Sequence, residues 1–186
     1  MTDIIKVVRQ FTEAVGCTTD QFNVRQTALY IGLQLEEMTE KLEALEWGGI
    51  NHTGGDFTTL IIRLKQASLM FKSGELDVAI HGADRSAMLD ADIDLAWVTI
   101  GSALSQGADI EGAAGEVARA NLAKLVTCNS CNGAGWYAGE TCSAHCTSCN
   151  GTGAVAIKDA NGKVKKPDGW AAPNIEPFVC QEAANG

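Results

Sequence analysis

The sequence predicts an all-α protein, a helical bundle with a small cysteine-rich module and a β-hairpin near its C-terminus. Apolar residues recur at three- and four-residue steps from residue 3 to about 126, without sustained alternation, which is typical of amphipathic helices. Glycine-rich breaks interrupt that pattern. Beyond it, residues 128–153 hold five of the seven cysteines, and their spacing is that of a metal site.

Caps and glycine breaks set the expected helix boundaries. Four or five helical segments are expected, as in many bundles. They run from Ile4 to Gly16, from an N-cap at Thr18, Thr19 or Asp20 to Gly48-Gly49, from Asp56 to about Lys72, from about Asp84 to Ser105, and from about Ile110 to Val126.

The C-terminal part lacks the helical periodicity of the preceding residues. In AVAIKDANGKVKKP two short β-prone runs flank Asn161-Gly162, which predicts a small hairpin. The remainder is proline-containing and is expected to be an extended tail, docked on the body or on a neighbouring subunit. The predicted division is therefore an all-α domain at 1–126, a metal-binding insertion at 127–153, and a hairpin with tail at 154–186.

Composition narrows the classes of function. Hydrophobic residues make up 46% and charged residues 20% of the chain, as in ordinary globular proteins. The net charge of −9 would repel a phosphate backbone, so no nucleic-acid partner is expected. The N-terminus lacks the apolar region of a signal peptide, and no run reaches the length of a membrane span. A cytoplasmic protein without a membrane partner is expected.

The cysteines form two copies of CxxCxGxG, at 128–135 and 146–153. Two such knuckles can supply four thiolates, from Cys128, Cys131, Cys146 and Cys149, to one tetrahedral Zn²⁺. A closed shell of four thiolates leaves no position for substrate, which favours a structural role. Cys142 and His145 lie near enough in sequence to replace one ligand. The repeat resembles the zinc-binding element of DnaJ-type chaperones, which carries four such repeats.

Two helical segments carry carboxylates one turn apart. In LQLEEMTEKLEAL, Glu36, Glu37 and Glu40 are expected to converge on one strip, which is either a solvated acidic face or a site. In MLDADIDLAWV, Asp90 and Asp94 lie on a segment apolar enough to be buried, where carboxylates need partners. Two helices that each offer such a pair can hold Mg²⁺ or Mn²⁺, which prefer oxygen ligands.

These motifs resemble those of the MazG-like all-α nucleoside triphosphate pyrophosphohydrolases, in particular a phage-borne branch related to phosphoribosyl-ATP pyrophosphohydrolases. The sequence EEMTE matches the first motif of that family, EExxE. Asp94 matches the Asp of the second motif, ExxD, but Ala91 stands where its Glu is expected. Asp90 is the preferred substitute, and Asp92 is an alternative. EVARANLAKLV and NGKVKKPDGW are similar to two further elements, which face the nucleotide and its phosphates.

The resemblance implies a metal-dependent enzyme that converts a (d)NTP, with dGTP as the first candidate, to the monophosphate and pyrophosphate. It implies a bundle completed in a homo-oligomer, either a dimer or a tetramer, in the host cytoplasm if the chain is phage-encoded. It also implies two or three Mg²⁺ or Mn²⁺ ions and a base at Glu37 or Glu40. The implied metal ligands are Glu36, Glu37, Glu40, Asp90 and Asp94, the implied substrate contacts are Asn121, Lys124, Lys163 and Lys166, and possible base contacts are Asn121, Gln10 and Trp97.

Two alternatives remain open from the residues themselves. The lysines of the C-terminal segment are also compatible with a solvated basic turn. The cysteine module on a helical scaffold is also compatible with a protein-binding adaptor that has no catalytic activity.

Overall fold

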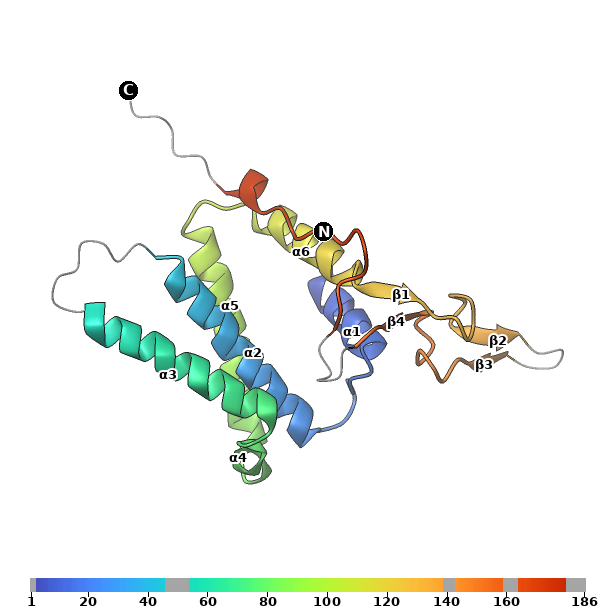
Figure 1. Cartoon of the computed structure of the whole chain (residues 1–186), viewed down its shortest axis with the longest axis horizontal. Coiled ribbons are helices and arrows are strands. Elements are labelled where there is room, and N and C mark those ends of the chain that lie inside the picture. The colour runs from blue at the N-terminus through green and yellow to red at the C-terminus, as the bar shows by residue number, and fades with distance from the viewer. Residues whose placement is uncertain (1–2, 46–53, 139–142, 159–163, 180–186) are drawn as a thin grey trace. The chain divides into compact units, whose positions relative to one another are not determined.

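The fold is mostly helical, and the predicted fold class is confirmed at that level, with small two-stranded sheets in the C-terminal part. The computed structural model describes residues 3–45, 54–138, 143–158 and 164–179 (Figure 1). Within these ranges the elements are α1 (Ile4–Ala14), α2 (Val24–Glu43), α3 (Gly54–Ser73), α4 (Asp77–His81), α5 (Arg85–Leu104), α6 (Ile110–Leu122), β1 (Leu125–Thr127), β2 (Trp136–Ala138), β3 (Ser143–His145), β4 (Ala154–Ala156) and the 3₁₀ helix η1 (Glu176–Phe178).

The chain packs as two compact units. One contains residues 1–19 and 89–186, and the other contains residues 20–88. The first unit therefore joins the two ends of the sequence, whereas the predicted segments follow one another along the chain.

Helix boundaries in the 20–88 unit differ from the prediction at α2. Thr18, Thr19 and Asp20 do not cap this helix, so that prediction is wrong. The cap is Asn23, whose extended backbone lets its side chain accept a hydrogen bond of 3.0 Å from the Gln26 amide. The helix ends at Glu43, well before Gly48-Gly49, which lies outside the described residues.

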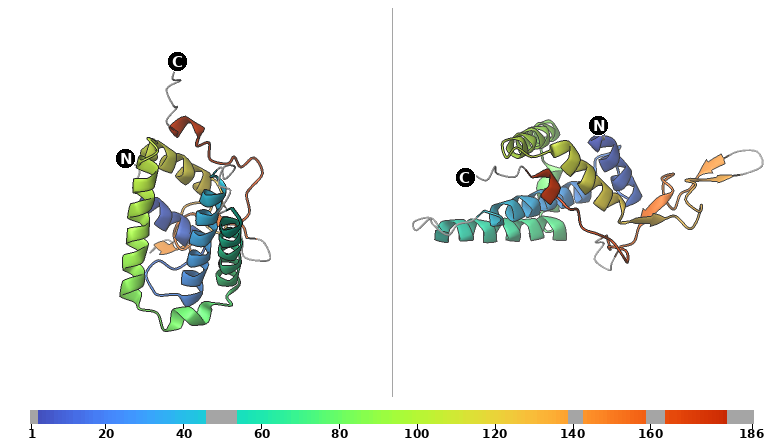
Figure 2. Two further views of the ribbon diagram at one scale, coloured as in Figure 1. Left: turned by 90° about the vertical axis from the view of Figure 1, so that its left-hand side faces the viewer. Right: turned by 90° about the horizontal axis from the view of Figure 1, so that it is seen from above.

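Helices α2 and α3 lie side by side and run antiparallel, as both views in Figure 2 show. They come into close contact at Gly32, whose carbonyl accepts a hydrogen bond of 2.7 Å from the buried Ser68 hydroxyl. A Cβ at Gly32 would lie 2.7 Å from Lys72 Cγ and 2.9 Å from the Ser68 carbonyl oxygen. The absence of a side chain therefore sets the spacing of this helix pair.

In the other unit, α1 packs on α6 and on β4. The side chain of Asp109 caps α6 by accepting a hydrogen bond of 3.0 Å from Gly112. The prediction that this helix continues to Val126 is wrong. It ends at Leu122 because residues 125–127 leave the helix to pair with β4.

The sheets are two short antiparallel ribbons. Strand β1 pairs with β4, with Val126 opposite Val155, and β2 pairs with β3, with Trp136 opposite His145. The predicted hairpin is correct only in part, because its first run contains β4, and β4 pairs with β1. What remains of the hairpin is a bridge between Lys158 and Val164, and its Asn161-Gly162 turn lies outside the described residues.

The C-terminal tail docks on α6 of the same chain. The Trp170 indole donates a hydrogen bond of 2.7 Å to the Ala120 carbonyl, and the Asn174 amide donates one of 3.0 Å to Glu116 Oε1. Farther along, the Asp109 amide donates a hydrogen bond of 2.9 Å to the Phe178 carbonyl. Three contacts along one helix therefore fix the path of the tail.

The close contact of α2 and α3 at Gly32 predicts that a larger residue there lowers the stability of the protein. Gly32→Ala should lower the free energy of unfolding by about 1–3 kcal/mol, because the added methyl group forces α2 and α3 apart. This loss opposes the gain of about 1 kcal/mol that alanine brings to a helix interior. Chemical denaturation followed by circular dichroism measures the difference.

Gly115→Ala is the matched control. A Cβ at this helical glycine of α6 would meet nothing within 4 Å, so only the gain in helix propensity remains. If Gly32→Ala were as stable as Gly115→Ala, the helix spacing would not depend on Gly32.

Candidate metal centre and charged pockets

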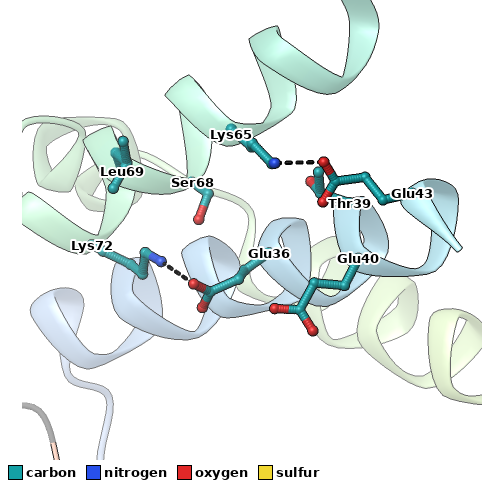
Figure 3. A pocket seen from close by; sticks show the side chains of 8 residues that line it. All are labelled: Glu36, Thr39, Glu40, Glu43, Lys65, Ser68, Leu69 and Lys72. Atoms are coloured by element: carbon teal, nitrogen blue, oxygen red, sulfur yellow. Dashed lines mark hydrogen bonds and ion pairs between the residues drawn. The ribbon is translucent and has the colours of Figure 1, made fainter. Parts of the chain in front are cut away.

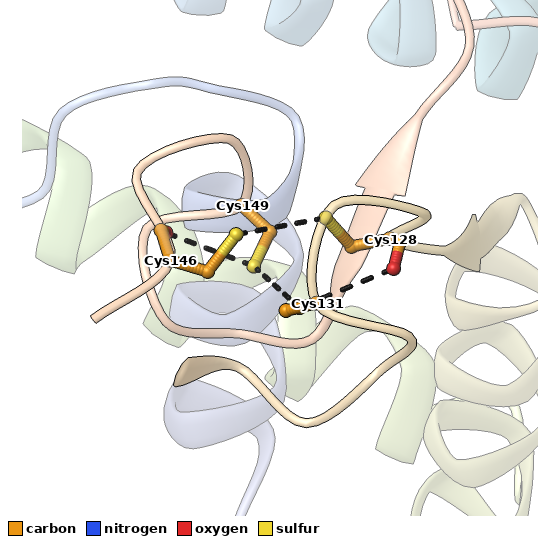
Figure 4. Close-up of side chains that lie close together, drawn as sticks. All are labelled: Cys128, Cys131, Cys146 and Cys149. Carbon is orange, nitrogen blue, oxygen red and sulfur yellow. Dashed lines mark hydrogen bonds between the residues drawn. The ribbon is translucent and has the colours of Figure 1, made fainter. Parts of the chain in front are cut away.

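Four cysteine side chains gather between the two knuckles (Figure 4). Cys128, Cys131, Cys146 and Cys149 are all buried, and their sulfur atoms lie within 4.8 Å of one another. Among the residues that the structure describes, this is the one group of three or more potential metal ligands so close together. The sequence prediction that these four residues meet is confirmed.

The sulfur positions fit a zinc ion. Cys128 and Cys146 have their sulfurs 3.8 Å apart, and so do Cys131 and Cys149. A tetrahedral zinc with zinc–sulfur bonds of about 2.3 Å has sulfur–sulfur edges of about 3.8 Å. A disulfide would instead require about 2.05 Å. The cluster is thus compatible with a structural zinc held by four thiolates.

The two knuckles have the same backbone hydrogen bonds. The Gly135 amide donates to Cys131 Sγ, and the Gly153 amide donates to Cys149 Sγ, each at 3.3 Å. The Cys128 amide donates to the Gly153 carbonyl and the Cys146 amide donates to the Gly135 carbonyl, each at 2.9 Å. Each repeat therefore closes on the other, and amide dipoles point at sulfur, where they favour a thiolate.

The last glycine of each repeat is required at this crossing. Gly135 and Gly153 have φ angles of +79° and +76°, in the region that disfavours side chains. A Cβ at Gly135 would also lie 2.3 Å from the Gly151 carbonyl oxygen. A Cβ at Gly153 would lie 2.2 Å from the Gly133 carbonyl oxygen. The second half of each CxxCxGxG repeat thus makes room for the other repeat.

One thiol in each knuckle has a shifted pKa, and the two shifts are in opposite directions. The Tyr137 hydroxyl lies 3.3 Å from Cys146 Sγ and lowers the pKa of that thiol to about 6. Burial raises the pKa of Cys131 to about 11. Contact with the Cys146 sulfur in turn raises the pKa of Tyr137. Tyr137 is therefore a hydrogen-bond partner of Cys146 that the sequence prediction missed.

Of the two alternative zinc ligands, Cys142 and His145, the described residues include only His145. His145 is exposed on β3 and does not belong to the four-sulfur group. Cys142 lies outside the described residues.

A pocket between α2 and α3 is lined by both acidic and basic side chains (Figure 3). The Lys72 ammonium lies 2.8 Å from Glu36, and the Lys65 ammonium lies 2.6 Å from Glu43. The Glu40 carboxylate lies between these pairs along α2 and makes no ion pair with another described residue. The remaining lining residues are Thr39, Ser68 and Leu69.

Not every predicted carboxylate lines this pocket. Glu36 and Glu40 do, and Glu43 joins them because it lies one further turn along the same face. Glu37 is on α2 but is absent from the lining. Asp90 and Asp94 lie on α5, in the other compact unit, and are exposed. Helix α5 has no buried residue within the chain, so the expected burial of this segment is wrong for a single chain.

A second pocket is predominantly basic. Lys124 and Lys166 line it together, and Lys165, which the sequence motif did not single out, lines it as well. The Lys124 ammonium donates a hydrogen bond of 2.7 Å to Asn121 Oδ1. Lys163 lies outside the described residues. The other lining residues are Val126, Ile157, Pro167 and Asp168.

The possible base contacts do not gather at either pocket. Gln10 is exposed on α1, and Trp97 is 78% exposed on α5. Neither side chain lines the acidic or the basic pocket.

No protein-family model, curated protein or solved structure matches this chain. The resemblance to the MazG-like enzymes therefore rests on the motifs described above. Within the described ranges, no helix combines the length and the apolar character needed to span a membrane.

The crossing of the two knuckles predicts the effect of a methyl group at Gly135. Gly135→Ala should weaken zinc binding by at least about tenfold, because left-handed strain of about 1–2 kcal/mol adds to the clash with Gly151. Competition with a chromogenic chelator measures the affinity. Gly169→Ala is the control, because Gly169 has a φ of +77° but open space around its Cβ position. Equal zinc affinity in both variants would contradict the crossing as the cause.

The contact between the C-terminal tail and Glu116 predicts that this carboxylate titrates below its usual pH range. A bidentate hydrogen bond from Arg119, with the Asn174 amide, lowers the pKa of Glu116 from 4.5 to about 2. Because the folded pKa is depressed, the contribution of Glu116 is complete above pH 4.5 and is lost as the pH falls toward 2. The Asn174 amide signal in NMR should stay constant between pH 6 and 4. In Arg119→Gln it should titrate in that range, and identical curves for both proteins would contradict this assignment.

Proposed function

We propose that the chain is a metal-dependent nucleoside triphosphate pyrophosphohydrolase, a MazG-like enzyme that converts a (d)NTP to the monophosphate and pyrophosphate. The observation that carries this proposal is the acidic pocket, in which Glu36, Glu40 and Glu43 face one side of α2 beside two lysines. The EExxE and second-motif resemblance supports it. The choice of dGTP as the first substrate to test rests on the resemblance alone.

The donor set fits Mg²⁺ or Mn²⁺ because these hard cations bind carboxylate oxygens. Glu36 and Glu40 would hold such ions from α2, with Glu37, Asp90 and Asp94 as further ligands in the proposal. When bound, the ions would neutralise the phosphates and lower the pKa of a bound water. Of the two candidate bases, Glu40 is favoured over Glu37 because Glu40 lines the pocket and makes no ion pair with another described residue.

Phosphate contacts in this proposal come from the basic pocket. Lys124 and Lys166 would add positive charge near the departing pyrophosphate, and Asn121 holds the Lys124 ammonium in place. Lys163 is kept as a further contact from the resemblance.

The proposed enzyme is a homo-oligomer, and the exposed face of α5 supports this. Large apolar side chains recur at helical spacing along it, and each is at least half exposed. A second copy of the chain that covers this stripe would also bury the flanking Asp90 and Asp94, which then need metal ions as partners. The stripe consists of Leu89, Ile93, Trp97, Ile100 and Leu104.

A second candidate function is a protein-binding adaptor built on the cysteine module. The observation that favours it is the exposure of Trp136, 56% exposed on β2, since aromatic residues are enriched in interfaces. The turnover assay below separates the two candidates, because an adaptor hydrolyses no nucleotide.

The enzyme proposal predicts turnover that depends on Glu40. Purified protein incubated with each dNTP and Mn²⁺ should release pyrophosphate, and Glu40→Gln should lower kcat by at least about a hundredfold, as expected for loss of a general base. A coupled pyrophosphate assay measures this. Glu111→Gln, an exposed glutamate in the first turn of α6, should keep full activity. No turnover of any nucleotide by folded, metal-loaded protein would disprove the proposal.

A further inference from the structure

The basic pocket concentrates positive charge on a strongly acidic protein. Among the described residues, three lysines and one carboxylate, Asp168, line it, whereas the whole chain carries a net charge of −9. Val126 and Ile157 give it an apolar wall, next to which charges interact more strongly than in open solvent. This combination points to an anionic ligand with more than one charge.

Trp170 holds two of these lysines in place. The Lys166 ammonium lies 4.2 Å from the centre of its ring, and the Lys124 ammonium lies 5.6 Å away. Both distances are within the range of cation–π attraction. The indole itself is fixed, because it donates a hydrogen bond of 2.7 Å to the Ala120 carbonyl.

The two ammonium groups lie near each other because both contact the same ring. Their distances to its centre limit their separation to about 10 Å. Lys165 enters the same pocket from the adjacent position in the chain, and its backbone is anchored by a hydrogen bond of 2.7 Å from its amide to the Ile157 carbonyl. The three charges are thus brought together by separate contacts before any ligand arrives.

A chain of linked phosphates suits this arrangement better than a single carboxylate. Each ammonium has three donors, so Lys124 can keep its bond to Asn121 and still donate to a phosphate oxygen. Several cations along one wall match several charged oxygens along one ligand, and charge-assisted hydrogen bonds are the strong ones. A monovalent anion could match only one of the three positive charges.

We propose that Lys124, Lys165 and Lys166 bind a polyphosphate chain directly, and that Trp170 is the positioning residue that holds two of them. The binding needs no metal at the glutamates of α2. This inference deepens the proposed function, since the substrate and the pyrophosphate product of that reaction both contain such a chain. It adds Lys165 and Trp170 to the residues of that site.

The test is calorimetric titration of the zinc-containing protein with inorganic pyrophosphate in buffer without Mg²⁺ or Mn²⁺. Wild type should bind pyrophosphate more tightly than monophosphate, and added salt should weaken the binding. Lys165→Met should lower the affinity by about tenfold, the usual effect of losing a charged hydrogen bond. Lys6→Met, which removes an exposed lysine of α1 that lines neither pocket, should leave the affinity unchanged.

The role of Trp170 is tested by paired variants. Trp170→Leu should lower the affinity by about tenfold, whereas Trp170→Phe should retain most of it, because a phenyl ring keeps a face for the ammonium groups. A purely structural role would predict equal losses, in proportion to the loss of thermal stability. Equal affinities in wild type and both Trp170 variants would remove Trp170 from the proposal.

The outcomes also separate this inference from the proposed function. Absence of pyrophosphate binding by folded wild type, or full binding by Lys165→Met, would overturn the inference even if nucleotides are hydrolysed. Pyrophosphate binding without any nucleotide turnover would support the inference and count against the enzyme. Glu40→Gln should lose turnover and keep pyrophosphate binding, since the two pockets use different residues.

Discussion

The pairing of β1 with β4 is the interaction on which the C-terminal half of the protein depends. The two strands have three residues each, and ribbons of this length are not stable alone in water. At one end the ribbon continues into the cysteine knuckles, through the hydrogen bond from Cys128 to Gly153. At the other end Lys124 precedes β1, and Ile157 follows β4, so the basic pocket begins where the ribbon stops. Zinc bound by the thiolates would therefore stabilise the backbone that places the lysines, because free energy of metal binding to an unformed site is free energy of folding.

Because the basic pocket depends on the β1–β4 ribbon, the cysteine module can influence that pocket without being catalytic itself. Four thiolates close together repel one another. A divalent ion compensates for this negative charge directly, and amide groups from Gly135 and Gly153 then stabilise the sulfurs. A shell completed in this way has no open position, so its effect on chemistry elsewhere passes through the β1–β4 ribbon.

The parts of this structure that the sequence predicts are those governed by local rules. The spacing of CxxCxGxG fixes both the ligands and the glycines, since each repeat needs left-handed backbone at the same places. Helical periodicity predicts α5 within one residue at each end. The partner of β4 was missed because a β-prone run does not specify its partner, and the alternative across Asn161-Gly162 was nearer in sequence. Lys165 was missed because the resemblance selects its neighbours Lys163 and Lys166, whereas the pocket is decided by the backbone after β4.

The acidic pocket was predicted in part for a similar reason. An EExxE motif identifies Glu36 and Glu40, but a sequence does not show that lysines from α3 neutralise two of the three carboxylates there. In the proposed function, metal ions would have to displace these ion pairs. Lys65 and Glu43 have half-exposed side chains, so that pair is worth only about 0–1 kcal/mol, whereas Lys72 in the other pair is 23% exposed. In the proposed function, a divalent cation bound by several carboxylates would offset the loss of these contacts. In the proposed enzyme these lysines would act as replaceable counterions on a helix face whose carboxylates otherwise repel one another.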